Sequence, residues 1–232
     1  AEGGACYTST LGRIEIMPAG GRGLFHGNMA IGSAGGSGHG GALHLTCGGM
    51  MDLKDCDFIG NSARDDGGAI HAREGRVDLE SCTFPAPGGI INQAGRNGGC
   101  IAIRSVDSHF PGSLGDLCNR IPSILTANGF TIAKSQARMG RGGAVFAEFG
   151  DELRLKLTLL TLRNGEILET LAATGLPGRP ADGIYLHDTG ESRKTLGQAI
   201  AALKTLKFAE RRTVNIRVAE RYLSNVILGN QD

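Results

Sequence analysis

Hydrophobic and polar residues alternate along one short segment of the chain. Val77 and Leu79 are apolar, whereas Asp78 and Glu80 are charged. A period of two is typical of a β-strand with one buried face and one solvent face. An apolar stretch at 67–72 precedes this segment across a polar turn, so the pattern predicts a strand, a turn and a second strand.

This strand pair belongs to a repeat. Residues 52–58 match residues 78–84 at an offset of 26 residues, which is typical of a solenoid. Three short strands joined by turns would return the chain to its start about 4.8 Å higher, so we expect an all-β, right-handed parallel β-helix. A glycine pair followed by a small and an aliphatic residue recurs four times, at Gly40, Gly41, Gly67, Gly68, Gly98, Gly99, Gly142 and Gly143.

The repeated residues have distinct expected roles. Glycine pairs suit corners, which need positive φ or close approach of neighbouring coils. Asn28 and Asn61 each follow a phenylalanine by three residues, so we expect their amides to stack as a ladder between coils. The third phenylalanine is followed by Pro-Ala-Pro, without that asparagine. The repeat phenylalanines are Phe25, Phe58 and Phe84.

The repeat also resembles a known family. Gly-Gly-Ala-Ile at 67–70 and Phe-x-x-Asn at 58–61, with Cys56 and Cys82 two residues before a phenylalanine, are similar to the repeats of chlamydial-type polymorphic outer membrane proteins. The resemblance covers about residues 20–150. It implies an autotransporter adhesin passenger, a right-handed β-helix of the pectin-lyase-like class, at the cell surface or outside the cell.

The composition changes near residue 150, because 31 of the 38 glycines precede it. We therefore expect Gly-rich repeats over 1–150 and final degenerate coils over 151–232. Leucines alternate over 153–159, and 182–186 resembles a fifth repeat unit. Apolar residues at helical spacing predict an amphipathic α-helix over 192–212, before a terminal strand. That helix would cap the solenoid, dock a partner or bind a membrane surface.

Charge and hydropathy exclude some partners. The chain has 24 basic and 23 acidic residues and no tryptophan, so no strong field or stacking platform favours nucleic acid. No apolar run reaches the roughly 18 residues that a transmembrane segment needs. The remaining expected partners are a protein at an open end of the β-helix and a glycan ligand.

All six cysteines lie in the first 118 residues, and none has the C-x-x-C spacing of a zinc ribbon. Buried thiols and disulfides both remain open. Cys56 and Cys82 occupy equivalent repeat positions, so we expect them on adjacent coils, within bridging distance.

The acidic residues and the histidines are the side chains that could carry chemistry. Asp65-Asp66-Gly67 and Gly38-His39-Gly40 resemble fragments of the polygalacturonase signature, but their order is reversed and its other parts are missing. We expect both to be solvated turns. Calcium binding by Asp52, Asp55, Asp57 and Asp78 is less favoured than solvent-facing charge, and the remaining histidines, at 26, 44, 71, 109 and 187, lack metal-ligand spacing.

The sequence therefore favours a non-catalytic structural or interaction module, without catalytic, cofactor or metal site. It would be an adhesin-like module or a scaffold subunit of a larger assembly. The alternative is a carbohydrate-active enzyme, a lyase or hydrolase with a groove along the solenoid. An extracellular or cell-surface location is expected, and an intracellular or organellar assembly is the alternative.

Overall fold

The computed structural model describes residues 3–32, 37–104, 118, 121–149, 158–168, 170–172, 182–188, 215–218 and 226–229. These residues form an all-β structure with one short 3-10 turn, Pro87–Gly89. The helix expected over 192–212 lies outside the described residues. Within the described part of the chain, no helix is long and apolar enough to cross a membrane.

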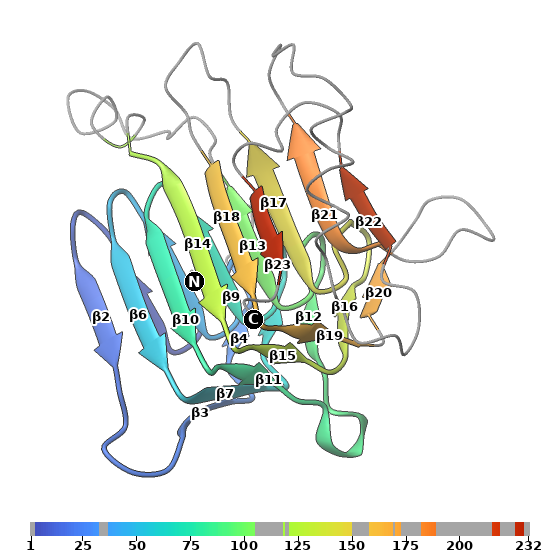
Figure 1. Cartoon of the computed structure of the whole chain (residues 1–232), viewed down its shortest axis with the longest axis horizontal. Coiled ribbons are helices and arrows are strands. Elements are labelled where there is room, and N and C mark those ends of the chain that lie inside the picture. The colour runs from blue at the N-terminus through green and yellow to red at the C-terminus, as the bar shows by residue number, and fades with distance from the viewer. Residues whose placement is uncertain are drawn as a thin grey trace.

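The strands form four parallel sheets, here named A to D (Figure 1). Sheet A contains β1 (Cys6–Thr8), β5 (Leu43–Thr46), β9 (Ile70–Arg73), β13 (Ile101–Arg104), β17 (Val145–Phe149), β21 (Asp182–Asp188) and β22 (Asn215–Val218). Sheet B contains β2 (Arg13–Ile16), β6 (Met50–Lys54), β10 (Arg76–Glu80), β14 (Ser123–Asn128), β18 (Thr158–Arg163) and β23 (Val226–Gly229). Sheet C contains β3 (Gly23–His26), β7 (Cys56–Ile59), β11 (Thr83–Phe84), β15 (Thr131–Ile132) and β19 (Glu166–Ile167). Sheet D contains β4 (Met29–Ala30), β8 (Ser62–Ala63), β12 (Asn92–Ala94), β16 (Ser135–Ala137) and β20 (Thr170–Ala172).

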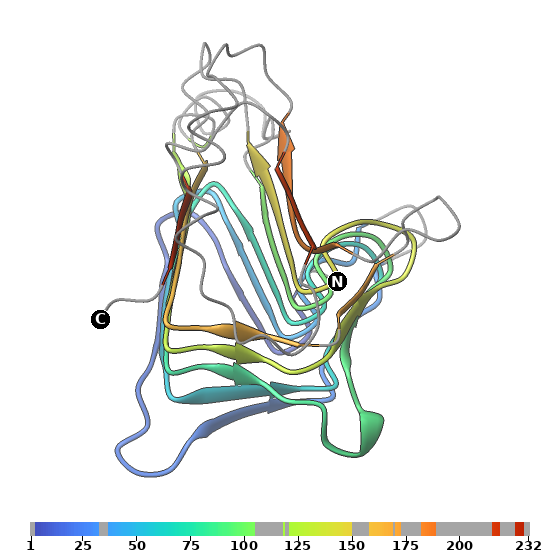
Figure 2. The ribbon, with the colours of Figure 1, turned by 45° about the vertical axis from the view of Figure 1, so that its right-hand side comes forward.

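From β1 to β20, four consecutive strands pass through sheets A, B, C and D in that order before the path repeats. This arrangement is consistent with a parallel β-helix, and each set of four strands is called a coil below. Figure 2 shows sheets A, B and C as three sides around the interior, with sheet D at the corner between C and A. The expected coil had three strands. The fourth arises because the chain bends at the asparagine position and separates sheet D from sheet C.

The 26-residue repeat sets the register between the second and third coils. In β6 and β10, Leu53 lies opposite Leu79 and Asp52 opposite Asp78. Leu53 and Leu79 are buried in the interior, so the expected alternation is confirmed. Beyond residue 150, β18 to β21 extend the same four sheets, whereas residues 151–157 of the expected leucine strand lie outside the described part.

Two side-chain columns join the coils. The rings of Phe25, Phe58 and Phe84 stack, with centroids 4.7 Å and 4.9 Å apart. In the asparagine column, the amide of Asn28 donates to Oδ1 of Asn61 (2.9 Å), and Asn61 donates to Oδ1 of Asn92 (3.0 Å). Sequence reasoning missed Asn92 because an insertion containing the 3-10 turn displaces it from its phenylalanine.

The glycine pairs occupy the corner between sheets D and A in four successive coils. The first glycine of each pair has a φ of +63° to +70°. The second must be glycine because the backbone of the next coil lies too close for a side chain. A Cβ on Gly41, Gly68 or Gly99 would lie 2.0–2.1 Å from the carbonyl oxygen of the equivalent glycine in that coil. Both requirements expected of a corner are therefore met, each by a different member of the pair.

The cysteines divide into thiols and one disulfide. Cys56 and Cys82 are buried thiols on adjacent coils, one position before the paired residues Asp57 of β7 and Thr83 of β11. A hydrogen bond with Cys82 lowers the pKa of the Cys56 thiol. The disulfide joins Cys47 to Cys118, whose Cα atoms are 4.7 Å apart.

Reduction of the Cys47–Cys118 bond is expected to destabilise the protein strongly. The bond closes a loop with a sequence separation of 71 residues, for which the chain-entropy relation gives roughly 4 kcal/mol. Urea midpoints with and without reductant measure this loss. A Cys47→Ser/Cys118→Ser variant should show no further response to reductant, and an equal response in both proteins would contradict the assignment.

Candidate functional site

The outer face of sheet A carries polar residues in an unusual environment. In β5 and β9 the leucine and isoleucine side chains point into the interior, and alternation places His44 and His71 on the opposite face. These histidines are nevertheless buried, with exposed fractions of 3% and 2%. A face that alternation predicts to be solvated is therefore covered.

The residue before each glycine pair lines the corner beside this face. These residues are His39, Asp66, Asn97 and Arg141. Each side chain of the first three accepts the backbone N–H of the equivalent residue one coil further on: Asp66 N to His39 Nδ1 (3.3 Å), Asn97 N to Asp66 Oδ1 (3.0 Å) and Arg141 N to Asn97 Oδ1 (3.0 Å). The same backbone geometry therefore positions a histidine and an aspartate side by side.

Asp66 is completely buried and has several partners. Its Oδ1 also accepts the side-chain amide of Asn97 (2.9 Å), and its Oδ2 accepts Nη1 of Arg104 (2.7 Å). Arg104 in addition donates from Nε to Glu148. Burial lowers the pKa of Arg104, but its bonds to Glu148 and Asp66 outweigh burial and raise it. The expectation of a solvated turn at Asp66 is therefore wrong, because the corner folds against the covered face of sheet A.

Three histidine rings contact one another, and two of them, His39 and His71, lie beside this carboxylate. The rings of His39 and His71 stack with centroids 4.4 Å apart, and the centroids of His44 and His71 are 4.8 Å apart. Burial is the main cause that lowers the pKa of His71 well below 6.5, followed by the charges of His39 and His44 and of two arginines, Arg104 and Arg73. His71 is therefore neutral at pH 7.

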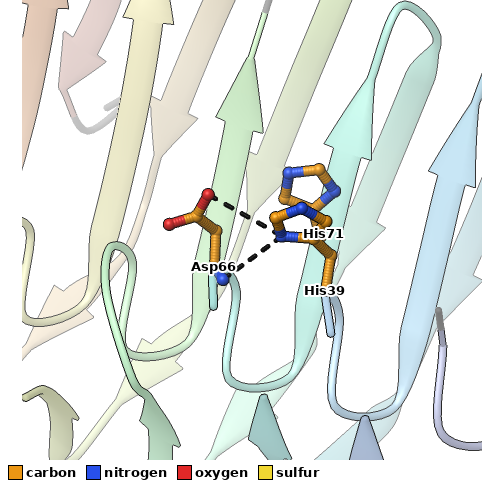
Figure 3. Close-up of side chains that lie close together, drawn as sticks. All are labelled: His39, Asp66 and His71. Atoms are coloured by element: carbon orange, nitrogen blue, oxygen red, sulfur yellow. Dashed lines mark hydrogen bonds and ion pairs between the residues drawn. The ribbon is translucent and has the colours of Figure 1, made fainter. Parts of the chain in front are cut away.

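His39, Asp66 and His71 form the tightest group of potential ligands, named here the histidine–aspartate cluster. One ligand atom from each residue lies within 4.8 Å of the other two. Figure 3 shows the Asp66 carboxylate facing the stacked rings, and Nδ1 of His39 is 3.7 Å from Oδ2 of Asp66. No local sequence motif predicts the cluster, because its members come from two coils. The sequence feature that could have predicted their proximity is that His39 and Asp66 both directly precede a glycine pair.

No known family model, curated protein or solved structure matches this chain. The resemblance to polymorphic outer membrane proteins therefore stays a prediction.

The aspartates considered as calcium ligands lie beside arginines. The nearest pairs are Asp52 with Arg13 at 2.7 Å, Asp55 with Arg22 at 3.7 Å, Asp57 with Arg22 at 2.8 Å, and Asp78 with Arg76. Arginine at these distances competes with a cation for the carboxylate oxygens. Asp66 is paired with an arginine as well, Arg104 at 2.7 Å, but among the described residues only the histidine–aspartate cluster adds imidazole nitrogens to the carboxylate.

Proposed function

We propose that the chain is a non-catalytic structural and interaction module, a right-handed parallel β-helix of the pectin-lyase-like class that joins another protein chain through its first coil. The module would serve as an adhesin-like element or as a scaffold subunit of a larger assembly. The observation that carries this proposal is the concentration of exposed apolar side chains on that coil.

The first coil, β1 to β4, forms one edge of each of the four sheets. Of the nine large apolar residues that are exposed in the described part of the chain, six lie in or beside this coil, and their exposed fractions run from 46% to 66%. They are Tyr7, Leu11, Met17, Leu24, Met29 and Ile31. Apolar surface that gathers at an open sheet edge favours pairing with another chain, because strand hydrogen bonds and burial then act together.

The carbohydrate-active alternative has less support. A glycosidase needs carboxyl groups that are free to exchange protons with sugar and water. Both carboxylate oxygens of Asp66 already accept hydrogen bonds, from Asn97 and Arg104. The test is an assay for reducing ends released from polygalacturonate. Activity in the wild type that disappears in His39→Asn would establish the enzyme instead.

Cysteine chemistry supports the proposed location. Disulfides persist in oxidising compartments and are rare where thiols are kept reduced. The Cys47–Cys118 bond therefore supports an extracellular or cell-surface location over an intracellular or organellar assembly.

Charged substitutions on the first coil test the docking proposal. The untagged chain is expected to associate with itself, and Leu24→Glu/Met29→Glu should be monomeric because charge at a sheet edge opposes pairing. Ile90→Glu/Met139→Glu changes two residues that are equally exposed elsewhere, at 51% and 77%, and should associate like the wild type. Light scattering over a 100-fold concentration range measures the mass. A wild-type chain that stays monomeric throughout would overturn the proposal.

A further inference from the structure

The imidazole of His71 is buried without hydrogen-bond partners. Its side chain is 2% exposed, and neither Nδ1 nor Nε2 has a hydrogen-bond partner. A buried polar atom without a partner destabilises the folded protein, and most buried polar atoms in proteins have a partner. Two unpaired nitrogens on one buried ring therefore indicate a ligand that the protein atoms do not supply.

We propose that His39, Asp66 and His71 bind a divalent transition metal ion, with Zn²⁺ as the best-fitting ion. Two imidazole nitrogens and a carboxylate oxygen form a donor set that suits Zn²⁺ and related ions. This inference is independent of docking through the first coil. It departs from the sequence prediction of no metal site.

The surroundings of the cluster fit such an ion. Asp66 is oriented by Asn97 and Arg104, and outer partners of this kind hold ligand carboxylates in metal sites. Arg104 opposes a cation, but it is shared by the two carboxylates of Asp66 and Glu148.

Binding requires a small rearrangement. Ligand atoms around tetrahedral Zn²⁺ are roughly 3.3 Å apart, given Zn–N and Zn–O distances of about 2.0–2.2 Å. The ligand atoms of the cluster lie within 4.8 Å of one another, so at least one ring must turn out of the stack. His39 is the residue that can do so, because its side chain is 17% exposed and Asp66 and His71 are buried.

The test uses His39→Asn, which removes the imidazole and keeps the corner. Asn97 accepts the equivalent backbone N–H with its side-chain oxygen, so asparagine at position 39 preserves that hydrogen bond. The control is His26→Asn, an exposed histidine in β3. Untagged proteins are stripped with EDTA, and ZnCl₂ is then titrated by calorimetry and thermal unfolding. Co²⁺ absorption reports on the ligand types.

We expect one Zn²⁺ per wild-type chain and per His26→Asn chain, with a Tm rise of roughly 5–10 °C at a free concentration 100 times Kd. In His39→Asn the affinity should fall at least tenfold. The Co²⁺ spectrum should show nitrogen and oxygen ligation without a thiolate charge-transfer band. Absence of binding to the wild type, equal binding to His39→Asn, or a thiolate band would each overturn the site.

Discussion

Gly68→Ala is expected to lower the free energy of unfolding by about 3–5 kcal/mol, or to prevent folding altogether. A Cβ at this position would lie 2.1 Å from the carbonyl oxygen of Gly99 and 2.6 Å from the backbone carbon of Gln93. These atoms belong to the backbone of the next coil, so no side chain can move aside. The coils would have to separate against their own strand hydrogen bonds.

Gly20→Ala is the matched control for this substitution. Nothing lies within 4 Å of a Cβ at Gly20, and its φ is not in the left-handed region. The control should unfold within about 0.5 kcal/mol of the wild type, as surface substitutions usually do. Urea unfolding of the two variants measures the difference. A loss below 1 kcal/mol for Gly68→Ala would contradict the packing of the glycine corner.

Arg104→Met is expected to cost about 3 kcal/mol, because it leaves Asp66 without its counter-charge. Removing one partner of a buried ion pair typically costs 3–5 kcal/mol, and the 24% exposure of the Arg104 side chain places this case at the lower end. Arg76→Met removes the partner of Asp78 in an exposed pair and should change stability by less than about 1 kcal/mol.

A double-mutant cycle isolates this interaction. Asp66→Asn in the Arg104→Met background removes the uncompensated charge, so the double variant should be more stable than Arg104→Met alone. Additive losses would show that Arg104 does not stabilise Asp66.

The sequence predicted the features that repeat and missed those that do not. The match between 52–58 and 78–84 predicted the observed register, because equal spacing requires equal coil paths. Asn92 was missed because an insertion breaks that spacing. The disulfide partner Cys118 lies within the long segment of the sequence between β13 and β14, where no repeat sets a register.

The histidine–aspartate cluster could not be predicted from local sequence patterns either. Alternation places His71 on the outer face of sheet A, and outer faces are ordinarily solvated. That expectation fails because the D-to-A corner covers this face, and the covering depends on how two coils stack. The positions of His39 and Asp66 before their glycine pairs were visible, but their burial was not.

Hydrogen exchange at the edge strands tests whether the first coil docks another chain. Exchange of backbone amides is compared between dilute and concentrated protein. The account predicts slower exchange in β1 to β4 at high concentration and little change in β9 to β12, which are paired on both sides. Unchanged exchange in β1 to β4, or protection confined to other coils, would contradict it.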